Sequence, residues 1–320
     1  MPERNVYTII SGTGRSGSNR LLDMFDASPY TVCRNEVNSI PGSSFFAVGG
    51  KLFFDDFSAT QRKMLRAAVD GATIRRSARD RLNQTDKDYL TRAGRISLGA
   101  MEKARLRNML AKLGVIGDAR EWIVPQVLLN DEGLSRARLV LKLNSCPAWA
   151  QSMVSEDNSC RIIHNIRDPR GFLNSWYNRL IKNGVGTTSF EENFGDVAPI
   201  LEYFGRTDAE RLRSPTEENL VEVDLWRWRH VNENLLSLES HAGQYIRISY
   251  KEIEADRVEV ARKAFAFAEL PFEAEEEARI GSLRNVLFQK PHTTRLDAEM
   301  CNRLVGKVLE DSPLKDLVET

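Results

Sequence analysis

The sequence has no long apolar run, little cysteine or histidine, and no excess charge of either sign. No stretch approaches the roughly 20 apolar residues that a membrane-spanning helix needs, and the first residues lack the pattern of a signal peptide. Lys and Arg number 45, as do Asp and Glu, so the formal net charge is zero. A general nucleic-acid binder normally shows a basic excess. We therefore expect a cytoplasmic protein without a membrane or nucleic-acid partner.

The cysteines and histidines are too scattered to form a disulfide framework or a familiar metal site. The four cysteines are Cys33, Cys146, Cys160 and Cys301. They include no Cys-x-x-Cys pair, which favours reduced, buried thiols over disulfides. No group of His and Cys residues has the spacing of zinc ligands. The sequence therefore predicts no metal site.

The 320 residues are 42% hydrophobic, which is enough for a substantial core. Four short apolar, β-branched runs predict buried parallel strands. These runs are Val6–Ile10, Arg138–Leu143, Cys160–Ile166 and Tyr245–Ser249. Helical patterns follow two of them, at Asn19–Phe25 and Gly171–Ile181. This alternation predicts an α/β fold with a P-loop-like parallel β-sheet flanked by helices on both faces.

Two segments interrupt the alternation of strands and helices. We expect a single domain over residues 1–320, with a helical insertion at 51–135 and a lid or loop region at 183–225. Within it, residues 51–122 carry 16 Lys and Arg against 9 Asp and Glu. We expect most of these charged side chains to lie on a solvent-exposed face of the insertion. The alternative is that they form a surface that binds an acidic substrate.

A glycine-rich loop that can hold an anion follows the first predicted strand. The run from Ser11 to Asn19 is Ser-Gly-Thr-Gly-Arg-Ser-Gly-Ser-Asn. Glycines let backbone N–H groups turn inward, and the N-terminus of the next helix adds positive potential. Arg15 adds a full charge, and the hydroxyl and amide side chains add donors.

Several chemistries suit this loop. Gly12, Gly14 and Gly17 match the Gly-x-Gly-x-x-Gly pattern of dinucleotide-binding proteins, and Glu36 follows about where a ribose-binding acid would lie. The P-loop NTPase pattern is absent, because Ser18 rather than lysine follows Gly17, and this disfavours a kinase. A loop for a phosphate or phosphosulfate is the third interpretation, and an ordinary turn between strand and helix is the fourth.

A second group of polar residues follows the third predicted strand. Arg167 comes at the end of that strand, and Ser175 comes eight residues later, within the following helix. Arg179 is four residues beyond Ser175, so the two share a helix face. Guanidinium and hydroxyl groups arranged in this way predict a second phosphate pocket. The alternative is an ordinary Arg-Asp turn followed by a helix surface.

Taken in this order, the two motifs resemble those of the sulfotransferases that use 3′-phosphoadenosine 5′-phosphosulfate (PAPS). The resemblance implies that the first loop holds the 5′-phosphosulfate and that Arg167, Ser175 and Arg179 hold the 3′-phosphate. The loop residues concerned are Gly14, Arg15, Ser16, Gly17, Ser18 and Asn19. Tyr250, which opens the run Tyr-Lys-Glu-Ile, is similar to the family tyrosine that packs against adenine.

The motif layout is closest to that of the tyrosylprotein and glycan-type sulfotransferases. In those enzymes a glutamate at the offset of Glu36 from Arg15 acts as the catalytic base, and a lysine that Lys142 resembles neutralises the transferring group. The cytosolic small-molecule enzymes carry a basic histidine in a Lys-Thr-His run. Here the run is Lys142-Leu143-Asn144, and the missing histidine favours Glu36 as the base. The alternative role for Glu36 is to cap the next turn.

The resemblance thus implies in-line transfer of a sulfuryl group from PAPS to a hydroxyl, or less favourably an amine, of a small metabolite or glycan. The product of the cofactor is 3′-phosphoadenosine 5′-phosphate (PAP), and Arg15 and Lys142 supply the positive charge without a metal. Two alternatives remain, namely an NAD(P)-dependent oxidoreductase built on Gly12, Gly14 and Gly17, and a nucleotide-binding protein without catalysis. The sequence leaves the acceptor and the oligomeric state open.

Overall fold

The computed structural model describes residues 6–77, 80, 86–101, 121–183, 190–207, 209–214, 216–283 and 296–318. The chain, which the sequence predicts to form one domain, divides into two compact units. Unit 1 comprises Met1–Asn165 and Leu238–Leu283, and unit 2 comprises Ile166–Ser237 and Arg284–Thr320.

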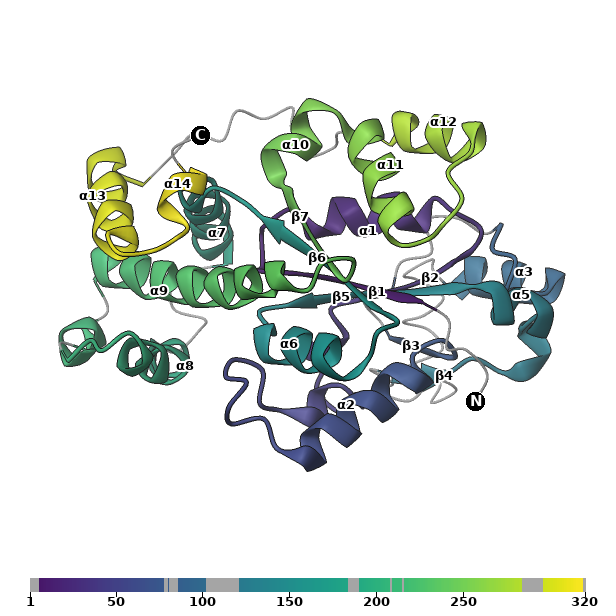
Figure 1. Ribbon diagram of the computed structural model, residues 1–320, viewed down its shortest axis with the longest axis horizontal. Coiled ribbons are helices and arrows are strands. Elements are labelled where there is room, and N and C mark those ends of the chain that lie inside the picture. The colour runs from purple at the N-terminus through teal and green to yellow at the C-terminus, as the bar shows by residue number, and fades with distance from the viewer. Residues whose placement is uncertain are drawn as a thin grey trace. The chain divides into compact units, whose positions relative to one another are not determined.

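Unit 1 is built on a five-stranded parallel β-sheet with the strand order β2-β5-β1-β6-β7 (Figure 1). The strands are β1 (Tyr7–Gly12), β2 (Thr31–Asn35), β5 (Arg138–Asn144), β6 (Cys160–Ile166) and β7 (Tyr245–Ser249). The sequence predicted all of these except β2, which is short and ends in the polar residues Arg34 and Asn35. The register pairs Gly12 with Asn144 and Asn35 with Lys142, so the carboxyl ends of β1, β2 and β5 meet at one edge.

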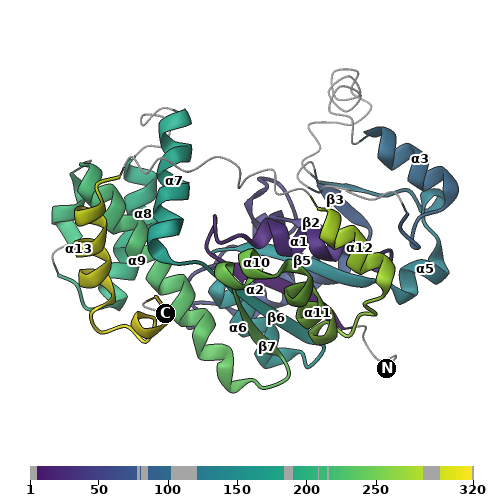
Figure 2. The ribbon, with the colours of Figure 1, turned by 90° about the horizontal axis from the view of Figure 1, so that it is seen from above.

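Helices cover both faces of this sheet, which confirms the predicted fold class (Figure 1). The helices of unit 1 that pack on it are α1 (Ser18–Asp26), α6 (Pro147–Glu156), α10 (Tyr250–Ala255), α11 (Arg257–Phe267) and α12 (Ala274–Ser282). Figure 2 shows α10, α11 and α12 beside α1, and α6 lies on the other face of the sheet. The start of α1, which carries the glycine-rich loop, is therefore held between the sheet and the α10–α12 layer.

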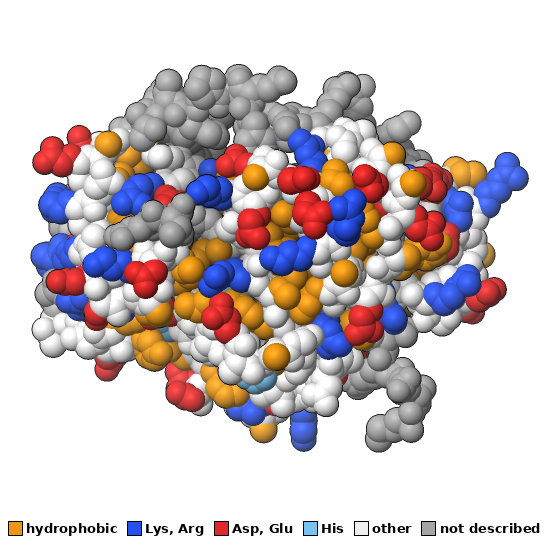
Figure 3. Space-filling model, turned by 45° about the horizontal axis from the view of Figure 1, so that its top comes forward, with side chains coloured by type: hydrophobic (Ala, Val, Ile, Leu, Met, Phe, Trp, Pro, Cys, Tyr) orange, Lys and Arg blue, Asp and Glu red, His pale blue; other side chains and the backbone are white. Residues whose placement is uncertain are grey.

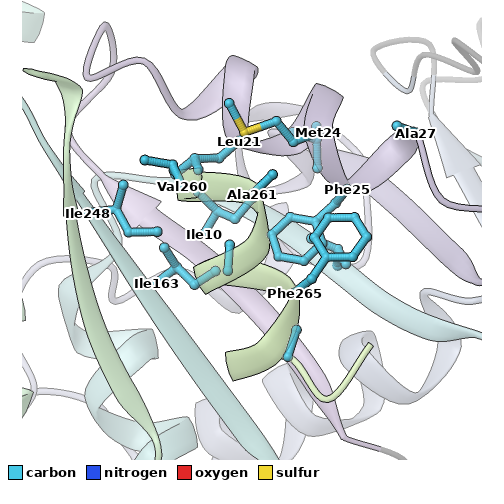
Figure 4. Close-up of a cluster of buried hydrophobic side chains, with 14 of the residues drawn as sticks. Ile10, Leu21, Met24, Phe25, Ala27, Ile163, Ile248, Val260, Ala261 and Phe265 are labelled. Carbon is cyan, nitrogen blue, oxygen red and sulfur yellow. The ribbon is translucent and has the colours of Figure 1, made fainter. Parts of the chain in front are cut away.

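A buried apolar cluster fixes the position of α1 (Figure 4). Phe25 of α1 stacks on Phe265 of α11 with ring centroids 5.1 Å apart. Ile10 of β1 and Ile163 of β6 lie in the same cluster, and all four side chains are fully buried. Burying a large apolar side chain contributes about 1.5–3 kcal/mol to stability. This packing positions the first turn of α1 at the carboxyl end of β1.

The described part of the insertion is not purely helical. It contains α2 (Ala59–Gly71), β3 (Arg75–Ser77), α3 (Arg92–Met101), β4 (Glu121–Ile123) and α5 (Asp131–Arg136), with short 3₁₀ turns η2 (Phe46–Val48) before it and η3 (Gln126–Leu128) within it. β3 and β4 pair antiparallel, and strands of three residues are too short for a recognisable alternation of apolar and polar residues. Helix α2 begins with a capping box formed by Ser58 and Gln61.

A buried lysine ties the insertion to the end of α1. Lys87 Nζ donates to the backbone oxygens of Asp26 (2.8 Å) and Ser28 (2.7 Å) and to Thr31 Oγ1 (3.1 Å). It also forms an ion pair of 3.0 Å with the Asp26 carboxylate. All the protons of this ammonium are therefore used within the protein fold.

Unit 2 is helical in its described residues. Its helices are α7 (Pro169–Asn183), α8 (Phe190–Tyr203), α9 (Glu217–Leu236), α13 (Ala298–Leu309) and α14 (Lys315–Val318). Figures 1 and 2 both show α8 and α13 alongside α9. The described part of region 183–225, predicted as a lid or loop, thus belongs largely to helices. Asp168 caps the N-terminus of α7, because its Oδ1 accepts from the N–H groups of Arg170 (2.8 Å) and Gly171 (3.2 Å).

The described residues include no helix that is long and apolar enough to cross a membrane. They also include no cluster of three His, Cys, Asp or Glu side chains able to hold a metal ion. All four cysteines are buried and free, and their reduced state stays a prediction. Basic and acidic side chains are interspersed on the face shown in Figure 3, as the balance of charges leads one to expect.

Candidate active site

The loop between β1 and α1 has the backbone geometry of an anion cradle. Gly17 stands at the N-cap of α1 with φ 97°, in the left-handed region. Arg15, with φ 72°, is also left-handed, which costs a non-glycine residue about 1–2 kcal/mol. The N–H groups of Gly17, Ser18 and Asn19 find no acceptor within the described parts of the chain. Unpaired donors at a helix N-terminus attract a negatively charged ligand.

Three hydroxyl groups at this end of β1 are buried without a hydrogen-bond partner among the described residues. They are Ser11 Oγ, Thr13 Oγ1 and Ser16 Oγ. Leaving a buried hydroxyl unpaired costs about 1–3 kcal/mol, so such a cluster calls for a ligand or water that supplies partners. Gly14 adds space, because a Cβ there would meet no atom within 4 Å. The residues of this loop therefore fit a phosphate-type group.

Tyr250 closes one side of the loop. Its ring lies against Gly17, since a Cβ at position 17 would come 2.8 Å from Tyr250 Cε2. The Arg20 guanidinium lies over the same ring, 4.9 Å from its centroid. Tyr250 is thus a neighbour of the cradle, and the adenine contact that the resemblance implies for it stays a prediction.

We expect Gly17→Ala to lower the free energy of unfolding by about 2–4 kcal/mol, because the left-handed backbone and the Tyr250 ring both oppose a Cβ. Gly14→Ala is the matched control, since the space around Gly14 is open. It should change stability by about 0.5 kcal/mol or less. Urea denaturation of both variants measures the difference. Equal stabilities would contradict the placement of the Tyr250 ring.

A buried lysine and a glutamate meet beside this loop. Lys142 Nζ donates to Glu36 Oε1 (2.7 Å), Asn19 Oδ1 (2.6 Å) and Asn35 Oδ1 (3.2 Å), and Lys142 is 1% exposed. These bonds use all three protons of the ammonium. The sequence predicted Asn19 as a donor to the cofactor, whereas its side-chain oxygen here accepts from Lys142. Its backbone N–H still belongs to the cradle.

Glu36 turns its carboxylate toward the strand ends. It precedes the 3₁₀ turn η1 (Val37–Ser39) with φ 50°, and its side chain makes no capping bond there. The alternative role of Glu36 as a turn cap is therefore wrong. Its carboxylate accepts from Lys142 and from Asn144 Nδ2 (2.8 Å), and its side chain is 27% exposed. A partly exposed carboxylate in such a place can reach a proton on a bound molecule.

Asn144 and Asn35 are neighbours of the predicted residues that the sequence did not identify. Asn144 makes the larger number of contacts. Besides donating to Glu36, it offers Oδ1 to Ser18 Oγ (3.4 Å) and its backbone oxygen to Asn38 Nδ2 (3.0 Å). It thereby links the cradle to the carboxylate. The period of two along a strand places Asn144 on the same face as Lys142, which is the signal that could have identified it. Burial raises the pKa of the adjacent Cys146 thiol to about 12, so this thiol is no nucleophile.

The second predicted pocket lies in unit 2. A Cβ on Gly171 would come 2.9 Å from Arg167 Nε, so the arginine side chain lies against the first turn of α7. Ser175, 7% exposed, follows Gly171 by one turn on the same face. Arg167 and Ser175 therefore belong to one side of α7. Arg179 is one turn further on, and its side chain lies outside the described residues.

The sheet order decides against the dinucleotide interpretation of the loop. In the dinucleotide-binding fold, β2 is the neighbour of β1, which lets the acid after β2 reach the ribose. Here β5 lies between β1 and β2. Glu36 follows β2 and pairs with Lys142 of that intervening strand. The loop therefore fits a phosphate-type group better than a dinucleotide, with the acid and the lysine paired beside it.

These features define an α/β protein whose glycine-rich loop, at the start of a helix, fits a phosphate-type group. Residues 141–298 match the family model of the sulfotransferase domain, and over this segment the chain belongs to the sulfotransferase family. The matched segment includes Lys142, Arg167, Ser175 and Tyr250. The glycine-rich loop and Glu36 lie before the matched segment, and their roles stay predictions.

Solved sulfotransferase structures resemble the chain at low sequence identity. One from Alicyclobacillus acidocaldarius has 15% identity and a TM-score of 0.43, with 99% of this chain and 96% of that chain covered. One from Mycobacterium avium has 16% identity and a TM-score of 0.43, with coverage of 97% and 77%. One from Mycobacterium tuberculosis has 12% identity and a TM-score of 0.46, with coverage of 95% and 77%. No curated protein matches the chain.

Proposed function

We propose that the protein is a PAPS-dependent sulfotransferase that acts on a hydroxyl group of a small metabolite or glycan. The observation that carries the proposal is the cradle with its unpaired buried hydroxyls, set beside the Lys142–Glu36 pair at one sheet edge. In this proposal the 5′-phosphosulfate is held by Gly14, Arg15, Ser16, Gly17, Ser18 and Asn19, the 3′-phosphate by Arg167, Ser175 and Arg179, and the adenine by Tyr250.

Each side chain of the pair has a separate task in the proposed reaction. When bound, PAPS would supply the sulfuryl group. The bond between its sulfur and the bridging phosphate oxygen breaks as sulfur bonds to the acceptor oxygen. The electron pair of the broken bond stays on the phosphate. Glu36 takes the proton of the acceptor hydroxyl. Arg15 and Lys142 hold positive charge where negative charge develops on the departing phosphate. These two cations take the part that a metal ion takes in many phosphoryl transfers, so the proposal includes no metal.

The timing of proton transfer follows from the strength of a carboxylate base. An ordinary glutamate, with a pKa of about 4.3, is too weak to deprotonate a free alcohol. The proton must therefore leave in the transition state, when the acceptor oxygen has become more acidic. The bonds from Lys142 and Asn144 both end on Glu36 Oε1, which fixes the orientation of the carboxylate for this step.

The test of this function is calorimetric and thermal-shift titration with PAP, against AMP, ATP with magnesium, and NADH. PAP at 100 times its dissociation constant should stabilise the folded protein by about 2.7 kcal/mol. Arg167→Ala should weaken PAP binding about tenfold to a hundredfold, because it removes charged hydrogen bonds, and Ser175→Ala should weaken it less. Arg170→Ala is the control, since Arg170 bonds to Asn302.

Other outcomes of the same titration select other functions. A response to NADH without one to PAP would favour the oxidoreductase, and a response only to ATP with magnesium would favour a kinase. PAP binding without sulfate transfer to any acceptor in a broad screen would favour a nucleotide-binding protein without catalysis.

A further inference from the structure

The chain after Glu36 folds back so that a second lysine, Lys51, is joined to Glu36 by a short series of hydrogen bonds. Lys51 Nζ donates to the backbone oxygen of Asn38 (2.8 Å), which comes two residues after Glu36. Asn38 Nδ2 donates to the backbone oxygen of Asn144 (3.0 Å), and Asn144 Nδ2 donates to Glu36. Two asparagines thus connect the Lys51 ammonium to the proposed base through three hydrogen bonds.

The backbone around Lys51 is fixed by α6 and α2. Gly49 and Gly50 have φ values of 65° and 53°, and a Cβ on Gly50 would come 2.7 Å from Gln61 Nε2. Trp149 Nε1 donates to the Gly49 oxygen (2.8 Å), and the Ala148 N–H donates to the Lys51 oxygen (3.2 Å). This double glycine turn directs Lys51 back toward Asn38, and only glycine tolerates such a conformation without strain.

The charge of Lys51 is not balanced within the fold. Among the residues that the structure describes, no carboxylate forms an ion pair with it, and Asn38 accepts one of its three protons. Its ammonium lies over the ring of Phe46, 5.1 Å from the centroid, and Phe46 is 44% exposed. Lys142 and Lys87, by contrast, each have three acceptors and a carboxylate partner. A cation with unused protons beside an exposed aromatic ring suits a ligand that combines an anionic group with an apolar body.

We propose that Lys51 binds an anionic group of the acceptor, and that the acceptor is therefore a hydroxyl compound carrying a carboxylate, sulfate or phosphate, with its apolar part on Phe46. This inference rests on the proposed sulfotransferase function. The cations assigned to the cofactor are Arg15, Lys142, Arg167 and Arg179, so Lys51 has no role in cofactor binding and is available to the acceptor. It is also the first residue of the basic insertion, for which an acidic substrate was one of the two interpretations.

The experiment measures acceptor binding in the presence of saturating PAP, so that no turnover is needed. The probes are 4-hydroxyphenylacetate, its neutral analogue 4-hydroxyphenylacetamide, and 4-hydroxybenzenesulfonate. We expect calorimetry to show about tenfold or more tighter binding of the carboxylate than of the amide, because a charged hydrogen bond is lost with the amide. Comparing 4-hydroxybenzenesulfonate with the carboxylate distinguishes a site for carboxylates from a site for sulfate or phosphate groups. Tighter binding of either anion than of the amide supports the proposal.

The variants separate the charge of Lys51 from its structural bond. Lys51→Gln keeps a donor for the Asn38 oxygen and removes the charge, so it should abolish the preference for the anion, whereas Lys51→Arg should retain it. Lys63→Gln, at an exposed position of α2, is the matched control and should leave the preference unchanged. Equal binding of acid and amide to the wild type, binding of no probe, or an undiminished preference in Lys51→Gln would overturn the proposal. Failure to bind PAP would instead reject the sulfotransferase function on which it rests.

Discussion

Glu36→Gln is expected to lower the turnover number for sulfate transfer about a hundredfold to ten-thousandfold, because the amide cannot accept the acceptor proton. The amide oxygen can still accept from Lys142 and Asn144, so the local structure should persist. The turnover number is measured under saturating PAPS and acceptor, and PAP affinity by calorimetry.

Binding and chemistry should separate in this variant. PAP affinity should stay within about twofold of the wild type, because Glu36 is not among the residues assigned to the cofactor and its shape is conserved. Glu254→Gln, at an exposed position of α10, is the control for loss of a carboxylate elsewhere in unit 1. If Glu36→Gln kept most of its activity, the base would have to be another residue.

Lys142→Met is expected to lower the turnover number about a hundredfold to a thousandfold, the usual cost of removing a group that stabilises transition-state charge. It also leaves the Glu36 carboxylate, Asn19 and Asn35 without the donor that joins them. A loss of activity in Lys142→Met can therefore come from slower chemistry or from a smaller amount of folded protein, and the two causes must be distinguished.

Lys87→Met supplies that separation. Lys87 is fully buried and paired with Asp26, so its replacement breaks a comparable network in the same unit and should lower stability by about 3–5 kcal/mol. Activity per folded molecule, with the folded fraction measured by circular dichroism, should fall in Lys142→Met and stay near the wild-type value in Lys87→Met. Proportional losses in both variants would assign Lys142 a structural role alone.

The parts of the candidate site that were predicted from the sequence are those whose residues lie close together along the chain. The loop from Ser11 to Asn19 carries its glycines and donors in nine positions, and its place between a strand and a helix follows from local patterns. Arg167 and Ser175 are likewise joined by one strand end and one helix. Turn chemistry and helix periodicity act over a few residues, so the sequence displays them directly.

The partners of these residues depend on pairing between distant segments. Glu36 meets Lys142 because β2 pairs with β5, and β2 is the strand that the apolar pattern missed. The roles of Asn144 and Asn35 follow from the same pairing. Lys51 reaches Asn38 through a double glycine turn supported by α6, and nothing in its immediate sequence indicates that contact. The ring of Tyr250 meets Gly17 across a still longer separation along the chain than that between Glu36 and Lys142.

The insertion of β5 between β1 and β2 also has a consequence for how the protein folds. Glu36 and Lys142 are 106 positions apart, and their ion pair exists only when β5, which is made after β1 and β2, enters between them. Contacts of such long range form slowly, because the closure of the intervening chain precedes any gain from pairing. Recovery of activity during refolding therefore reports completion of the central sheet. A nascent chain that ends before β5 lacks the lysine with which Glu36 pairs.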